Sequence, residues 1–185
     1  MPQSVHLPQL SVEDYLMGED GAACRHEYIN GMVYAMTGAS DRHGLITLNI
    51  AAYLHPRLRG TPCQLFASDM KLRLDIQDQT LFYYPDLLLS CDPEDRATYY
   101  RRAPCALVEI LSNSTERIDR QEKRLAYQTL PSLQDYLIIA QSERRVEAYR
   151  RTTQWAAEVT TSGAVTLNCL ELDLSLDIIY EGISL

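Results

Sequence analysis

Two carboxylates and one lysine lie at positions where a protein normally places apolar side chains. Asp86 follows Pro85 at the end of an apolar run, and Glu109 lies inside a second apolar run. Lys123 follows in a segment with helical spacing. Two inward carboxylates and one inward lysine leave a net negative charge, which a divalent cation such as Mg²⁺ or Mn²⁺ would balance with hard oxygen ligands. The trio therefore predicts a metal site with an activating lysine.

Metal-assisted hydrolysis of a phosphodiester is the chemistry that suits such a trio. A metal ion in this setting holds a phosphate oxygen and lowers the pKa of a water molecule. Lys123 would orient or deprotonate that water and offset the charge that develops on the phosphate. A buried ion-pair network without any catalytic role produces the same residue pattern, so both interpretations stay open at this point.

The apolar runs indicate how the two carboxylates are held. Glu109 lies in residues 106–111, which are apolar on both faces and so typical of a central strand that is covered on both sides. An ionised carboxylate there needs a cation, a metal ion or a proton as a partner. A further strand is predicted over residues 80–91. Pro85 cannot donate a ladder hydrogen bond, so we expect the pairing to break or kink there and Asp86 to turn into a cleft.

Helical geometry predicts the direction of Lys123. The spacing predicts a helix that Asp119 opens, with Glu122 completing a capping box, and that runs to Leu130. The residues three, four and seven positions after Lys123 are apolar, so we expect Lys123 to point inward with them. Only two of the 17 Lys and Arg residues are lysines, and only lysine can lose its proton at accessible pH.

The other patterns predict a mixed α/β fold. Residues 70–74 alternate between apolar and charged side chains, which places Lys71 on a solvent-facing side. Asn30-Gly31 predicts a hairpin turn, because a type I′ turn needs positive φ at both central positions. Helices are predicted over 10–16, capped by Ser11, and from Ser40 or Asp41, either of which would be the cap, to about 58. Strands are predicted over 27–34 (the hairpin), 63–66, 70–74, 105–111, 135–140, 145–151, 154–160 and 164–167. This order predicts a central mixed sheet with helices packed on it.

Length and composition bound the kind of protein. A chain of 185 residues with 46% hydrophobic residues predicts one domain over 1–185 with a substantial core. There is neither a secretory signal nor an apolar run long enough for a membrane span, so we expect a cytoplasmic protein that makes no membrane contact. The net charge of −8 speaks against a generally basic nucleic-acid binder. Residues 96–151 nevertheless carry a positive balance, which either meets phosphate or is an ordinary solvated surface.

The five cysteines give no sign of a site. They are odd in number, widely spaced and free of any C-x-x-C pair. This pattern argues against a disulfide framework or a zinc site and suits a reducing cytoplasm. We therefore expect them to act as small apolar filler.

Several short segments, each present once, follow one another in a characteristic order along the chain. They are His26–Gly31, Ser40–His43, Tyr84–Asp86, Val108–Ser112, Asp119–Lys123 ahead of Tyr127, and Tyr136–Ile139. Together they resemble the Uma-type family within the PD-(D/E)xK nuclease superfamily, over about residues 11–180. The resemblance implies a restriction-endonuclease-like core, with Asp86 and Glu109 as metal ligands and the Ile110 carbonyl completing the set. The superfamily pattern places lysine two residues after the glutamate, where this chain has Leu111, so Lys123 would have to reach the same point.

Two more residues are candidates for the site. His43 lies in the first turn of its predicted helix, where it would be a phosphate contact, a general acid, a supporting donor or simply a hydrogen-bonded core residue. Glu27 opens the hairpin and would either approach the metal from the side or pair with Arg25 or another neighbour.

Three hypotheses of function follow. The first is a Mg²⁺-dependent endonuclease that acts on nucleic acid, with DNA the expected substrate, and that forms a homodimer because cutting both strands favours two-fold symmetry. The second is a catalytically silent, nuclease-like module that binds nucleic acid or a partner protein. The third is hydrolysis of a small phosphodiester or another metal-dependent reaction that does not involve DNA.

Overall fold

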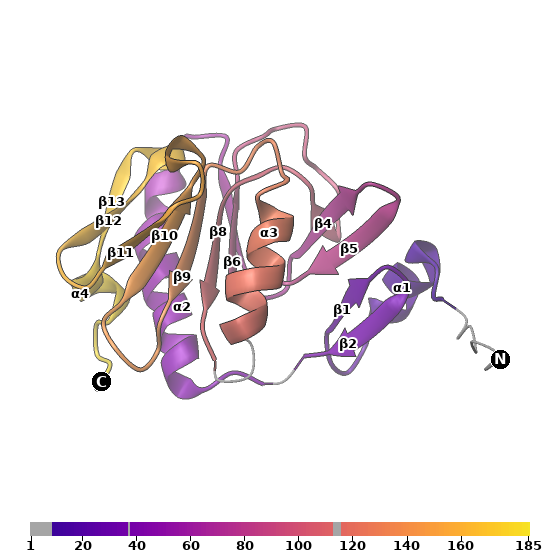
Figure 1. The fold of residues 1–185 in the computed structure, drawn as a ribbon, viewed down its shortest axis with the longest axis horizontal. Coiled ribbons are helices and arrows are strands. Elements are labelled where there is room, and N and C mark those ends of the chain that lie inside the picture. The colour runs from indigo at the N-terminus through magenta and orange to yellow at the C-terminus, as the bar shows by residue number, and fades with distance from the viewer. Residues whose placement is uncertain (1–8, 37, 113–115) are drawn as a thin grey trace.

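A computed structural model describes residues 9–36, 38–112 and 116–185. Within these ranges the chain forms two large sheets and one small one (Figure 1). The first sheet has the strand order β2 (Met32–Ala35), β1 (His26–Ile29), β5 (Gln79–Tyr83), β4 (Lys71–Ile76) and β7 (Tyr100–Arg101). The second has the order β11 (Ala157–Thr160), β10 (Val146–Arg150), β9 (Asp135–Ile139), β8 (Pro104–Ile110), β6 (Leu87–Ser90) and β3 (Gln64–Ala67). The small sheet pairs β12 (Ala164–Leu167) with β13 (Leu172–Ser175).

The helices are short apart from one. They are α1 (Val12–Glu19), α2 (Asp41–Leu54), α3 (Arg124–Tyr127) and α4 (Leu176–Ile179), with the 3₁₀ turns η1 (His55–Leu58), η3 (Arg151–Thr153) and η4 (Asn168–Leu170) and the π-helix η2 (Ile118–Lys123). The hydroxyls of Ser11 and Ser40 accept hydrogen bonds from backbone N–H groups in the first turns of α1 and α2. This confirms the predicted cap at Ser11 and shows that Ser40, of the two candidates, caps α2. No helix in the described ranges combines the length and the apolar character that crossing a membrane requires.

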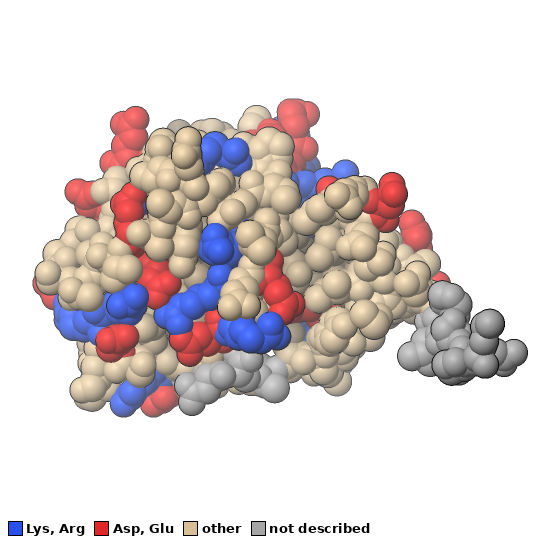
Figure 2. All heavy atoms as spheres, in the orientation of Figure 1, with Lys and Arg blue, Asp and Glu red and all other residues tan. Residues whose placement is uncertain are grey.

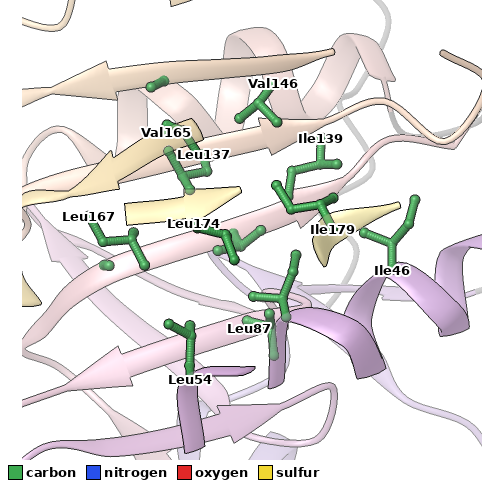
Figure 3. Close-up of a cluster of buried hydrophobic side chains, with 14 of the residues drawn as sticks. Ile46, Leu54, Leu87, Leu137, Ile139, Val146, Val165, Leu167, Leu174 and Ile179 are labelled. Carbon is green, nitrogen blue, oxygen red and sulfur yellow. The ribbon is translucent and has the colours of Figure 1, made fainter. Parts of the chain in front are cut away.

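The six-stranded sheet is the centre of the molecule because both of its faces are covered. On one face, Ile46 and Leu54 of α2 pack with Leu87, Leu137 and residues of the small sheet (Figure 3). On the other face, α3 and strands β4 and β5 form a second core cluster. The pair β8–β9 is parallel and the other pairs in this sheet are antiparallel, so the sheet is mixed. The mixed α/β architecture expected from the sequence is therefore confirmed.

The strand predicted over 80–91 is divided in two at the predicted break, and its two parts belong to different sheets. The chain leaves β5 in one sheet and enters β6 in the other, with Tyr84, Pro85 and Asp86 between them. Proline cannot donate to a ladder, which is the physical reason for a break at this point. Asp86 consequently lies at the joint between the two large sheets.

Two charged residues lie deeper than their patterns suggested. Lys71 was expected on a solvent face, but it is buried, with its ammonium 5.3 Å from the ring centroid of Tyr84. Asp119 was expected to open a helix as part of a capping box. It is instead 2% exposed and lies inside η2, because its carboxylate faces Lys123 in the protein interior.

The expectation that the cysteines are separate apolar filler is wrong for at least two of them. Cys63, just before β3, and Cys91, just after β6, form a disulfide. The two strands are antiparallel neighbours, and their pairing Gln64 with Ser90 brings the flanking cysteines face to face. Widely spaced cysteines can therefore meet through sheet pairing, which spacing along the chain does not reveal.

The β1–β2 turn yields a stability prediction. Asn30 and Gly31 both have positive φ, as the type I′ prediction required. A Cβ added at Gly31 would lie 2.5 Å from Cβ of Gln9. We expect Gly31→Ala to lower the free energy of unfolding by about 1–3 kcal/mol, measured by urea denaturation, because strain and a clash act together.

Gly18→Ala is the matched control for this substitution. Gly18 lies in α1, and nothing lies within 4 Å of the position that its Cβ would take. Alanine is a better helix former than glycine, so this change should leave stability unchanged or slightly raised. Equal free energies of unfolding for the two variants would contradict the role assigned to the turn.

Candidate active site

The fold brings the predicted trio together. Asp86, Glu109 and Lys123 line one cleft of about 470 Å³, together with His43 and Ile110. The carboxylates come from the sheet joint and from β8, and the lysine comes from η2. Residues that are far apart in the sequence thus share one concave surface, as a site requires.

Asp86 is held from two sides. Its Oδ2 atom accepts a hydrogen bond of 2.7 Å from the backbone N–H of Ile110 and lies 3.1 Å from Nε2 of His43. The first contact joins the carboxylate to β8, and the second joins it to the first turn of α2. His43 therefore supports Asp86 directly, and its side chain remains about 15% exposed at the cleft.

Glu109 is almost completely buried, as its position in β8 predicted. Its Oε1 atom accepts a 2.8 Å hydrogen bond from the hydroxyl of Tyr127 and lies 3.3 Å from Nζ of Lys123. Burial raises the pKa of Glu109 well above its ordinary value, and the negative charges of Asp119 and Asp86 act in the same direction. The ammonium of Lys123 acts in the opposite direction, but the pKa of Glu109 remains raised.

Lys123 brings a positive charge to the carboxylate of Glu109, which Leu111 cannot do. Leu111 is buried in the apolar cluster beneath α3, while Nζ of Lys123 lies 3.0 Å from Oε1 of Glu27 and 3.3 Å from the nearest oxygen of both Glu109 and Asp119. Burial by itself would lower the pKa of Lys123, but these three carboxylates outweigh it and raise the pKa well above the ordinary value. The lysine therefore keeps its proton.

Two members of this network were missed by the sequence interpretation. Asp119 and Tyr127 flank Lys123 at four positions on either side, which on a helix is the same face. Asp119 had been assigned to a cap and Tyr127 to the apolar face. The four-residue spacing of Asp119 and Lys123 could have revealed the pair, since a buried lysine needs a partner for its charge and a residue one helical turn away can supply it.

Glu27 pairs with Lys123, and not with the adjacent Arg25. Arg25 instead lies 3.0 Å from Asp69 and lines the cleft beside Ser68, whose carbonyl accepts a 2.6 Å hydrogen bond from its guanidinium. Glu27 approaches the trio from β1 in the other sheet. The lysine thus connects both large sheets and the helical segment.

The oxygen atoms of the site suit a hard cation. Among the described residues, no hydrogen bond reaches Oδ1 of Asp86 or Oε2 of Glu109. No group of three or more His, Cys, Asp or Glu side chains in the described ranges has an arrangement that could hold a metal ion. Two carboxylates and a backbone carbonyl fit Mg²⁺, which usually keeps several water molecules and takes only one or two carboxylates from the protein.

The positive segment over 96–151 is not a continuous basic surface. Figure 2 shows Lys and Arg beside Asp and Glu on the face that carries α3. Arg120 lies 2.7 Å from Glu147, and Arg117 lies 2.8 Å from Glu122. These pairs favour the interpretation of a solvated surface.

Two relatives match this chain along most of its length. The chain is 34% identical to the uncharacterized protein slr1290 of Synechocystis sp. over 186 residues, which cover 98% of this chain and 96% of that protein. It is 32% identical to the uncharacterized protein sll1609 of the same organism, over 79% of this chain and 84% of that one.

A solved structure has the same fold. It is a protein of Anabaena variabilis described as a "putative nuclease belonging to DUF820", with a TM-score of 0.69 and 18% identity, over 85% of this chain and 90% of that one. The sequence profile of Uma2, described as "Putative restriction endonuclease", matches residues 12–178. With this match over nearly its whole length, the chain belongs to the Uma2 family of restriction endonuclease-like proteins.

Proposed function

We propose that this chain is a Mg²⁺-dependent endonuclease that hydrolyses phosphodiester bonds of DNA. The observation that carries the proposal is the position of Lys123, whose ammonium lies 3.3 Å from the buried carboxylate of Glu109 although it comes from a separate helix. A π-helix is rare and is frequently found at functional sites, and η2 carries this lysine at its last position.

The site would hold Mg²⁺, or Mn²⁺ in its place, through Asp86, Glu109 and the carbonyl of Ile110. The chemistry that such an ion supplies is neutralisation of phosphate charge and activation of a water molecule. Glu27 has its Oε1 atom 3.0 Å from Lys123, which supports a role in positioning the lysine in place of the metal contact that the sequence suggested.

The side chains of this site divide the remaining work. Lys123 keeps its proton, so it would act as a fixed positive charge and hydrogen-bond donor toward water and phosphate, and not as a base. Arg25 lines the cleft and would bind a flanking phosphate. His43 holds Asp86 and lies close enough to the cleft surface to pass a proton to the departing oxygen.

Cleavage should depend on all three members of the trio. We expect Asp86→Asn, Glu109→Gln and Lys123→Met each to lower Mn²⁺-dependent nicking of supercoiled plasmid at least 100-fold, because each removes charge at the reacting phosphate. Glu122→Gln is the control, since it makes the same chemical change to a half-exposed carboxylate on the same helix. Undiminished cleavage in the three variants would contradict the proposal.

A metal titration separates the proposal from the binding-module alternative. Calorimetry should detect Mn²⁺ binding to the wild-type protein at millimolar concentrations or below and no binding to Asp86→Asn. A wild-type protein that binds no divalent ion would favour a nuclease-like module without catalysis.

Cleavage of plasmid should also fall steeply with added salt, whereas hydrolysis of a small phosphodiester should not.

The pKa of Glu109 gives a pH-dependent prediction for the metal-free protein. Because the folded-state pKa is raised, the unfolded chain releases this proton first, and stability is lost as pH rises above about 4.5. Gln cannot ionise, so the stability of Glu109→Gln relative to wild type should grow with pH, by up to ~1.4 kcal/mol per pH unit.

Urea denaturation between pH 4 and pH 8 measures this difference. The same measurement on Glu122→Gln is the control, because it makes the same chemical change to a half-exposed carboxylate of the same helix. A relative stability of Glu109→Gln that shrinks as pH rises would show that Glu109 is ionised more easily when folded than when unfolded.

A further inference from the structure

Four cysteines that are scattered along the sequence converge at one place in the fold. Cys63 and Cys91 form a disulfide, and Sγ of Cys105 lies 3.4 Å from Sγ of Cys91. Cys169 lies in η4, and its thiol and that of Cys105 shift each other's pKa. All four pack in or against the core cluster under α2, whereas Cys24 is exposed and belongs to another part of the chain.

The group lies at the opposite end of the central strands from the cleft. Asp86 precedes β6 and Cys91 follows it, while Cys105 lies near the start of the antiparallel strand β8 and Glu109 lies near its end. No step of the proposed hydrolysis uses these sulfur atoms. Their proximity therefore calls for a separate account.

We propose that these four cysteines form a thiol–disulfide exchange site. The Cys105 thiolate attacks Sγ of Cys91, a Cys91–Cys105 disulfide forms, and the Cys63–Cys91 bond breaks. Cys63 leaves as a thiolate and takes up a proton from solvent, while the proton of Cys105 is released before attack. One disulfide is exchanged for another, so no external oxidant or reductant is needed.

The geometry supplies an attacking group in contact with its target. Cys105 lies in β8 beside the end of β6, so the two strands hold its sulfur against Cys91. The interaction with Cys169 lowers the pKa of Cys105 even though burial acts the other way, and Cys169 keeps its own proton because its pKa is raised by the same interaction. A thiolate is the reactive form in exchange.

The structure also supplies a setting for the leaving group. Cys63 lines a second pocket, of about 300 Å³, together with His55 and Arg59. Positive charge near a departing thiolate favours its release. After exchange, the Cys63 thiol would face this pocket, where a small thiol-reactive molecule or an external disulfide can reach it.

The exchange would change which strands are joined covalently. The disulfide of the present structure links the segments that flank β3 and β6, an edge strand and its neighbour. The exchanged disulfide would link β6 to β8 and leave the edge strand without a covalent link. This end of the molecule would then expose a reactive thiol without a change in overall oxidation state.

Alkylation followed by non-reducing peptide mapping tests the proposal. The wild-type protein, purified without reductant, is incubated with iodoacetamide at pH 8 under native conditions. We expect Cys63 to become alkylated as a Cys91–Cys105 disulfide accumulates. In Cys105→Ala, which keeps a small apolar side chain in the core, alkylation of Cys63 should fall at least tenfold and the Cys63–Cys91 disulfide should persist.

Cys24→Ser is the matched control, since it removes an exposed cysteine outside the group and should leave the alkylation of Cys63 unchanged. Cys169→Ala should slow the alkylation without abolishing it, because it removes the interaction that lowers the pKa of Cys105 and leaves Cys105 beside Cys91. Wild-type protein in which Cys63 stays unmodified, or is modified as fast as in Cys105→Ala, would overturn the proposal. That measurement on the wild type does not depend on whether any variant folds.

Discussion

The ammonium of Lys123, surrounded by three carboxylates, is the interaction on which the rest of the site depends. Glu27, Glu109 and Asp119 come from two sheets and one helix, and a single buried positive charge compensates them. Buried charges are tolerated when they are paired, so each of these four residues helps to offset the cost of burying the others. Burial is the main reason why the carboxyl of Glu109 resists ionisation, and the excess of negative over positive charge around it acts in the same direction.

The break at Pro85 places Asp86 at the cleft beside that network. A strand that continued from β5 into β6 would place residue 86 within a ladder, paired on both sides. The chain instead changes sheets, and Asp86 is left at a corner where a neighbouring strand and the first turn of α2 both reach it. Glu109, only one position before the N–H that binds Asp86, then lies beside it at the base of the cleft.

Much of this arrangement could be predicted from the sequence. Local signals were sufficient for the caps at Ser11 and Ser40, for the turn at Asn30-Gly31 and for the inward direction of Lys123, because each depends on residues close together in the chain. The partners of Lys123 were predicted less well. Glu27 reaches Lys123 only because the strands pair as they do. Asp119 also fitted a capping box with Glu122, so its position four residues before Lys123 was not used.

The cysteines show the same limit in a different form. Their spacing excluded the familiar motifs, yet strand register placed Cys63 opposite Cys91 and brought Cys105 to the same spot. Register depends on which strands become neighbours, and that is decided by the packing of the whole chain. Motif searches along a sequence cannot detect a group that only the sheet assembles.

The three-way contact of Lys123 also has a mechanical consequence. Since Glu27 belongs to one sheet and Glu109 to the other, the ammonium of Lys123 links the two sheets beside the cleft. A ligand that moved the two sheets apart would have to lengthen the 3.0 Å contact of Lys123 with Glu27 or its 3.3 Å contact with Glu109, both of which are largely buried. Separation of the two sheets and displacement of the Lys123 ammonium are therefore coupled, because the same two contacts resist both.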